Sequence, residues 1–209
     1  MNDMSPAPSR AQHTHPSSHA RQPVVAPDGT RLFVRDWGSG RPVVFLAGWC
    51  LISDSWAYQM HSLVHSGLRC IAYDRRGHGR FDDPGQGYDY DTLADDLAAV
   101  LAQNNLSEVT LVAHSMAGGE VIRYLSRHGS QRIARICLLG TTAPALLQTP
   151  DNPLGVPSAF FEQMRAELSE DFPGWIARNT EAFVIPSTSL ALRAWLTGHM
   201  TQTSLQAVL

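Results

Sequence analysis

One serine is the residue of this sequence best placed to do chemistry. Ser115 lies in the stretch LVAHSMAGGEVIRYL, directly after an apolar run and directly before a helical pattern. Small residues, Ala113 and Ala117, stand two positions before and after it, as a sharp turn from strand to helix requires. Such a turn strains the backbone of the serine, and the free amides of the helix start favour a developing oxyanion. Ser115 is therefore a candidate nucleophile, although a serine N-cap gives the same local pattern.

A base that could activate Ser115 is harder to find. The sequence has no lysine, which excludes a lysine base or a Schiff base. His114 is next to the serine, but consecutive side chains diverge there, so we expect it to pack under the turn. Of the later histidines, His128 would lie about 19 Å away along the predicted helix. His199 could approach as a substitute base, although no acid is placed to orient it.

Alternating strands and helices must position this turn. PVVAPDGTRLFVRDWGSGRPVVFLAGW predicts three strands, with a turn at Asp28–Gly29 and the third strand at 43–47. Further strands are predicted at 70–74, 109–113 and 133–140, and helices at 54–67, 91–103 (with Asp91 as its cap) and 116–128. Helical pieces near 158–169, 173–184 and 188–208 follow. The order predicts an α/β fold, with a mostly parallel sheet, helices on both faces and a helical cap segment.

Composition limits the possible partners and compartments. A net charge of −3 gives no electrostatic case for nucleic acid, and no apolar run is long enough to span a membrane. Three widely spaced cysteines, Cys50, Cys70 and Cys137, favour a reducing cytoplasm over a disulfide framework or a zinc site. Residues 1–22 have the Pro, Ser and His content of a disordered tail. Its histidines 13, 15 and 19 could bind a metal only weakly, because nothing rigid orients them.

The motifs together resemble a known family. The segments PDGTRLFVRDWGSGRPVVFLAGW, DSWAYQM, IAYDRRGHGR, GYDYDTLADDLAAVL and HSMAGGEVIRYLSRHG occur in order between about residues 23 and 145. They resemble the α/β-hydrolase superfamily, in particular its cofactor-free non-haem chloroperoxidase, perhydrolase and arylesterase branch. The resemblance implies an α/β-hydrolase core over 23–145 and a helical cap region over 146–209. Asp74, Arg75, Arg76 and His78 are expected to be structural, and Phe81 stands where the family more often has serine.

The resemblance also implies a reaction. Ser115 would attack a small carboxylic ester and form an acyl-enzyme, which water, or peroxide in the perhydrolase branch, would resolve without metal or cofactor. The oxyanion would be held by the backbone N–H groups of Met116 and Trp49, although the usual His-Gly-Trp is here Ala47-Gly48-Trp49. Apolar cap residues would favour small acyl or aryl esters, or most of them would simply belong to the core, namely Phe160, Phe161, Phe183, Ile185 and Trp195. Cys50, beside Trp49, is expected to be a buried apolar residue.

The family's acid and histidine have no counterpart in these 209 residues. The resemblance places them after two further strands, so the triad is expected to be incomplete, the chain truncated, and the 209 residues inactive or nearly so. Without those strands, the segment 133–140 becomes an uncovered apolar edge that could self-associate. Two alternatives stay open: a non-enzymatic binding module with a degenerate hydrolase fold, and lyase or dehalogenase chemistry. A serine at position 115 argues against dehalogenation, which in this fold uses a carboxylate.

Overall fold

The computed structural model describes residues 22–142 and 145–209, so most of the predicted disordered tail lies outside the described residues. A five-stranded sheet forms its centre, in the order β3-β5-β4-β6-β7. The strands are β3 (Val34–Trp37), β4 (Arg41–Leu46), β5 (Leu68–Tyr73), β6 (Val109–His114) and β7 (Ile133–Leu139). Only β3 runs antiparallel to its neighbour; the other pairs are parallel. The predicted mostly parallel sheet is therefore confirmed.

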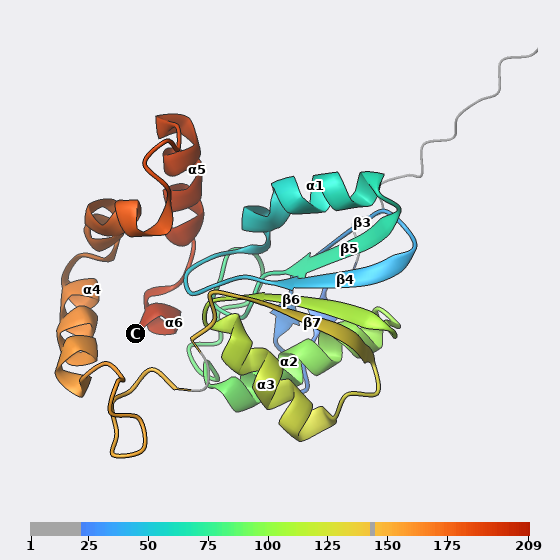
Figure 1. The fold of residues 1–209 in the computed structure, drawn as a ribbon, viewed down its shortest axis with the longest axis horizontal. Helices are drawn as coiled ribbons and strands as arrows, with labels where there is room; N and C mark the ends of the chain where they lie inside the picture. Colours follow the sequence, from blue (N-terminus) through green and yellow to red (C-terminus); the bar gives the residue numbers. More distant parts are fainter. Residues whose placement is uncertain (1–21, 143–144) are drawn as a thin grey trace, which may run out of the picture.

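Helices cover the two faces of the sheet (Figure 1). One face carries α1 (Ala57–His65), which follows the short 3-10 helix η1 (Ser53–Trp56). The other carries α2 (Tyr90–Gln103) and α3 (Ala117–His128). Alternation along β4 serves both faces: Val43 and Phe45 pack with the α1 layer, while Val44 and Leu46 pack with the α2 and α3 layer. A continuous apolar run is the sequence signature of such a strand.

Two details differ from the sequence-based expectation. The second predicted strand is interrupted at Phe33, so that β2 (Arg31–Leu32) pairs with β1 (Val24–Val25), and only β3 joins the main sheet. The cap of α2 is Asp89 rather than Asp91, because Asp89 accepts hydrogen bonds from the amides of Asp91 and Thr92. Asp91 instead forms an ion pair with Arg123 of α3.

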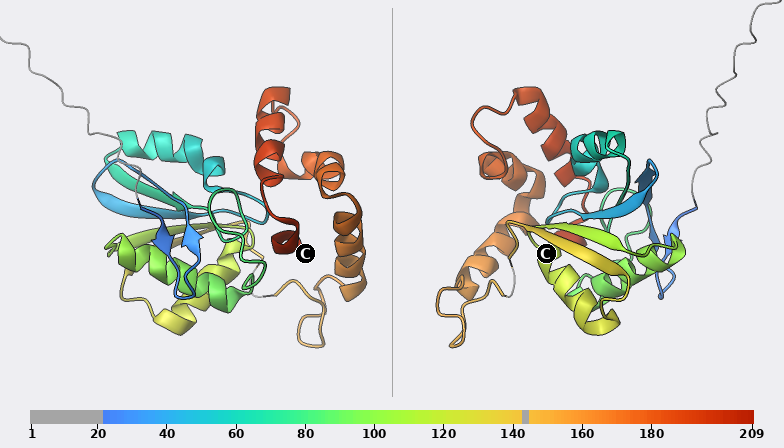
Figure 2. Two further views of the ribbon diagram at one scale, coloured as in Figure 1. Left: turned by 180° about the vertical axis from the view of Figure 1, so that it is seen from behind. Right: turned by 45° about the vertical axis from the view of Figure 1, so that its right-hand side comes forward.

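The helices after β7 form one group at the end of the sheet (Figures 1 and 2). They are α4 (Ser158–Asn179), η2 (Thr180–Phe183), α5 (Leu190–Met200) and α6 (Leu205–Val208). Two helices were expected where α4 lies, and a kink at Asp171 does divide it. A cluster that includes Cys50, Leu168, Ile176 and Met200 packs this group on the loop after β4.

The sheet is unequally covered. Strand β7 is an edge in the described chain, and all but the first of its residues are exposed. Its large apolar side chains Ile136, Leu138 and Leu139 are each at least 40% exposed. In contrast, the central strands β4 and β5 are buried over most of their length.

Candidate active site

The turn at Ser115 is strained, as the sequence predicts. Ser115 lies between β6 and α3 and has a φ of 55°, in the left-handed region that non-glycine residues rarely adopt. Its amide donates to the carbonyl oxygen of Leu139 (3.0 Å), and its own carbonyl oxygen accepts from Gly118 (3.1 Å). These bonds attach the turn both to β7 and to the first turn of α3. These two hydrogen bonds stabilise the left-handed backbone conformation of Ser115.

Small residues let other segments approach this turn closely. Ala113 and Ala117 are fully buried beneath it. A Cβ atom on Gly48 would stand 2.8 Å from Nδ1 of His114 and 3.3 Å from Cβ of Ser115. The loop after β4 therefore passes directly beside the serine, and a glycine is required at its nearest point.

Two backbone amides at this place have no acceptor. Within the described parts of the chain, neither the N–H of Met116 nor the N–H of Trp49 makes a hydrogen bond. Met116 is the residue after Ser115 and the N-cap of α3, and Trp49 follows Gly48 in the adjacent loop. Unpaired amides beside a serine at a helix start are the elements of an oxyanion site. The assignment of these two donors remains a prediction.

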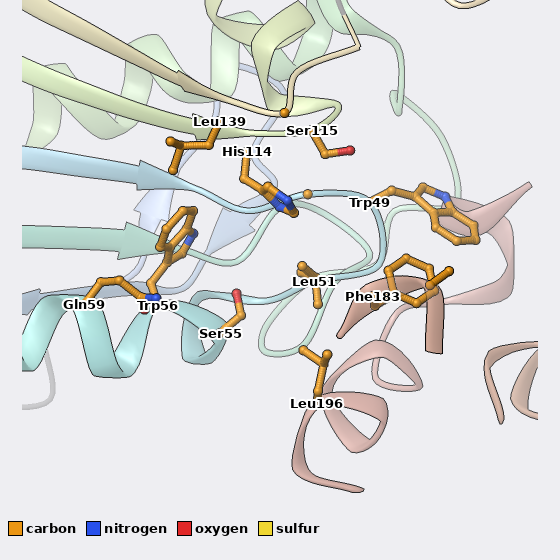
Figure 3. A pocket seen from close by; sticks show the side chains of 13 residues that line it. Trp49, Leu51, Ser55, Trp56, Gln59, His114, Ser115, Leu139, Phe183 and Leu196 are labelled. Carbon is orange, nitrogen blue, oxygen red and sulfur yellow. The ribbon is translucent and has the colours of Figure 1, made fainter. Parts of the chain in front are cut away.

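A cavity of about 660 Å³ opens at Ser115 (Figure 3). Its lining includes the apolar side chains of Trp49, Leu51, Leu139, Phe183 and Leu196. Polar groups come from Ser55, Gln59, His114 and Ser115, and no Asp, Glu or Arg side chain of residues 22–142 and 145–209 contributes. The described lining of the cavity is therefore largely apolar and carries no acidic side chain and no arginine.

Of the five apolar cap residues expected at the site, the structure places one in this cavity. Phe183 lines it, whereas Phe160 and Ile185 are largely exposed. The ring of Phe161 meets that of Phe160 edge-on. Trp195 packs against Tyr58 and His199. Their distance from Ser115 could not be predicted, because it depends on how the cap packs on the core.

Of the histidines in the described part of the chain, His114 is the one that lines this cavity. Its ring meets Trp56 edge-on, with ring centroids 6.4 Å apart. Figure 3 shows the imidazole and the Ser115 hydroxyl leaving the backbone in different directions, as expected for consecutive residues. Burial, with a smaller contribution from the charge of Arg75, lowers the pKa of His114. His114 is thus neutral near pH 7, but is not aimed at the hydroxyl.

The two later histidines are held elsewhere. Nε2 of His128 lies 2.7 Å from a carboxylate oxygen of Asp95 at the far end of α3. His199 does not line the Ser115 cavity; its Nε2 lies 4.0 Å from Asp54, and its ring packs against Trp195. Burial and the nearby charge of Arg80 lower the pKa of His199. Among the described residues, therefore, no histidine faces Ser115 with a carboxylate behind it.

Buried ion pairs hold the segments around the turn. Arg75 donates to Glu120 (2.7 Å), which also accepts from the hydroxyl of Tyr73, and all three side chains are buried. Arg76 bridges Asp96 (2.6 Å) and Asp28 (2.7 Å). The expected structural role of both arginines agrees with these contacts. Glu120 was missed in the sequence, where a carboxylate in the first turn of a helix is usually a solvated group favoured by the helix dipole.

The other residues singled out in the sequence are structural in their contacts. Asp74 accepts from the amide of Ser53 (2.8 Å) and from Arg80 (2.8 Å). Cys50 is fully buried against the cap helices, and burial raises the pKa of its thiol. Phe81 has a φ of 74° and stacks on Phe33. His78 is buried and contacts the carbonyl oxygen of Arg76 (2.9 Å).

Metal clusters and membrane-spanning helices are both absent from the described residues. No group of three or more His, Cys, Asp or Glu residues there could hold a metal ion. Likewise, none of the helices in ranges 22–142 and 145–209 combines the length and apolarity needed to cross a membrane. The histidines at 13, 15 and 19 lie outside the described residues. A cytoplasmic location remains a prediction.

Comparison with known proteins gives the same fold. Residues 41–186 match the family model described as the alpha/beta hydrolase fold. A non-heme haloperoxidase of Rhodococcus erythropolis is 50% identical over 68% of this chain and 52% of its own length. Among solved structures, an esterase from Exiguobacterium antarcticum superposes with a TM-score of 0.86 at 33% identity, covering 90% of this chain and 70% of that one. A bromoperoxidase from Bacillus anthracis gives 0.82 at 35%, covering 86% and 67%.

The lengths of these proteins differ from that of this chain. The chain spans about half the length of the curated relatives it matches.

Proposed function

The chain belongs to the alpha/beta hydrolase fold family, and from this premise we propose that Ser115 is the nucleophile of a hydrolase acting on small carboxylic esters. The observation that carries the proposal is the strained serine between two amides without acceptors. A serine in the left-handed region is costly, and such strain persists where the surrounding structure enforces it, often at a reactive group.

We propose the following reaction at this site. The Ser115 oxygen attacks the ester carbonyl carbon, its proton passes to a base, and the carbonyl oxygen becomes an oxyanion facing the N–H groups of Met116 and Trp49. Collapse breaks the bond to the alcohol, which leaves with a proton, and an acyl-enzyme forms. Attack by water then releases the carboxylic acid, and attack by hydrogen peroxide would release a peracid. Neither step needs a metal or an organic cofactor.

The cavity supports the substrate class. Its 660 Å³ and its apolar wall of Trp49, Leu51, Phe183 and Leu196 suit a short acyl or aryl group. Its lack of charged side chains disfavours a substrate that carries a charge, because a buried unpaired charge is costly. Small neutral esters fit both properties.

No described residue is placed to act as the base for Ser115. Since His114, His128 and His199 are all turned elsewhere or held by other residues, we propose that the described residues alone turn over esters very slowly. The same observation favours the second candidate, a binding module that takes up small neutral ligands without hydrolysing them. An added external base therefore distinguishes the hydrolase from the binding module.

Hydrolysis of p-nitrophenyl acetate by the 209-residue chain, compared with Ser115→Ala, tests the nucleophile. Free imidazole is added to both proteins as a replacement base, and the rate of Ser115→Ala at each concentration is subtracted. We expect a small difference without imidazole and a difference that rises and saturates as imidazole is added. A difference of zero throughout would contradict the hydrolase, and saturable binding of the ester without turnover would then favour the binding module.

A further inference from the structure

Two exposed histidines lie side by side on α1. His61 and His65 are four positions apart, so they stand on the same face of the helix, one turn from each other. Their ring centroids are 4.6 Å apart, and the ring planes meet at 60°. Within residues 22–142 and 145–209, no other two histidine rings contact each other. The reaction proposed for Ser115 uses neither of them.

The helix itself sets the tautomer of His65. Nδ1 of this ring lies 2.7 Å from the carbonyl oxygen of His61. Because a carbonyl oxygen can only accept, Nδ1 carries the proton and donates it. The lone pair of the neutral ring is therefore on Nε2, the nitrogen that the helix leaves free. Histidines that bind metals have this arrangement, in which one ring nitrogen donates to a carbonyl or carboxylate and the other binds the metal.

The ring of His61 is free to act as a second ligand. In the described parts of the chain, no hydrogen bond or ion pair joins this ring to another residue, and its ring contact is with His65. The helix, AYQMHSLVH, carries no carboxylate that would pair with an imidazole and no arginine that would repel a cation. Both rings therefore offer a nitrogen to a ligand from solvent.

Packing holds the two histidines in place from below. Met60, between them and the sheet, is fully buried in the cluster that contains Val43 and Phe45. The exposed face of α1 is thus fixed on the β-sheet, whereas nothing rigid orients the histidines expected to bind a metal weakly near the N-terminus. Ligands that are already positioned lose less freedom when a metal binds.

The donor atoms indicate which kind of metal. Imidazole nitrogen suits late first-row cations such as Ni²⁺, Cu²⁺ and Zn²⁺, and of these Cu²⁺ binds most tightly. Zn–N bonds are about 2.0–2.1 Å, so two rings this close can reach one ion of this class after small rotations of their exposed side chains. Mg²⁺ and Ca²⁺ prefer oxygen ligands. Since the described chain brings no third His, Cys, Asp or Glu to the pair, water would fill the remaining positions.

We propose that His61 and His65 form a two-imidazole site on the surface of α1 for a divalent late first-row metal ion, with Cu²⁺ bound most tightly. The site is separate from the Ser115 cavity, and it does not depend on Ser115 being a nucleophile.

Titration of the 209-residue chain with Cu²⁺ tests the site. Every protein of the series carries His13→Asn, His15→Asn and His19→Asn, which removes the histidines near the N-terminus as competing ligands. We expect His61→Asn and His65→Asn each to raise the Cu²⁺ Kd at least about tenfold, because water then replaces one imidazole. Excess Mg²⁺ should not displace the Cu²⁺. An unchanged Kd in either variant, displacement by Mg²⁺, or no binding by the parent chain would each overturn the proposal.

His128→Asn is the matched control. His128 is also exposed at the end of a helix, but the ring four positions before it is that of Tyr124, which stacks on it at 5.3 Å. Its Cu²⁺ Kd should equal that of the parent chain. A loss as large as in His61→Asn would show that exposed histidines bind Cu²⁺ singly, and would overturn the pair.

Electron paramagnetic resonance of the bound Cu²⁺ counts its nitrogen ligands. We expect coupling to two imidazoles in the parent chain and in His128→Asn, and to one imidazole in His61→Asn and His65→Asn. Coupling to a single imidazole in the parent chain would contradict a site that both histidines share.

Discussion

The two sides of Ser115 differ in how far they are buried and held by ion pairs. Toward α2 and α3, the turn is supported by buried residues and by the Arg75–Glu120 and Arg76–Asp96 pairs. Toward β7, the strand is exposed along most of its length, and no histidine of the described chain approaches from that side. We call these the supported side and the open side. The comparison teaches that a strand, a turn and a helix can build a nucleophile site locally, whereas its base must come from a different segment.

The largest effect is expected from the buried pair on the supported side. Glu120→Ala would leave Arg75 as a buried charge without its partner, and breaking such pairs costs about 3–5 kcal/mol. Urea unfolding measures the loss. Asp95→Ala is the control, because Asp95 pairs with Arg127 at a partly exposed site, where about 0–1 kcal/mol is expected. Equal losses of unfolding free energy in the two variants would contradict a larger contribution from the buried Arg75–Glu120 pair.

The second prediction concerns the border between the two sides. Gly48→Ala would place a Cβ 2.8 Å from the His114 ring and push away the loop that carries Trp49. Loss of one oxyanion donor lowers turnover by roughly 100-fold or more, so we expect a drop of about 100-fold in the Ser115-dependent rate with imidazole present.

Gly198→Ala is the matched control for this prediction. An added Cβ there meets nothing within 4 Å, and Gly198 lies inside α5. Its rate should be unchanged, and its stability should rise by up to about 1 kcal/mol, since alanine favours the helix. If Gly48→Ala also kept the full rate, the Trp49 amide would not be an oxyanion donor.

Much of the supported side was predictable, because its signals are local. The apolar runs at 43–47, 70–74 and 109–113 gave strands within two residues of the observed bounds, and Ser115 has the strain that its small neighbours indicate. The cap of α2 was misplaced at Asp91 because Asp89 and Asp91 both suit that position. Only the Arg123 contact, from a helix far along the chain, shows why Asp91 is engaged elsewhere.

The buried carboxylate of Glu120 could not be predicted, because it depends on a contact between distant segments. Arg75 and Glu120 are 45 positions apart, and nothing in either local sequence marks the pair. Likewise, the apolar cap residues were correctly seen as apolar, but their orientation depends on how α4 and α5 pack.

A third prediction concerns the pH dependence of stability that arises from the buried His78. Burial first, and Arg75 second, lower the folded-state pKa of His78 from 6.5 to about 4, so unfolding takes up a proton below pH 6.5. Stability should therefore fall as the pH falls from 6.5 to 4, with a contribution of at most about 1.4 kcal/mol per pH unit. His78→Asn should flatten the curve measured by urea unfolding. Parallel curves for wild type and His78→Asn would contradict this origin of the pH dependence.

The smallest effect is expected on the open side, where we propose that the 209-residue chain self-associates through β7. Leu138 is 46% exposed on this edge, and an unpaired apolar edge can pair with a second copy. Leu138→Lys should weaken association about tenfold, because a charge at the edge opposes pairing. Leu154→Lys is the control, since Leu154 is 96% exposed but lies outside β7. Sedimentation equilibrium over a range of concentrations measures both. A wild-type chain that stays monomeric at every concentration would show that the open side, although apolar, does not pair.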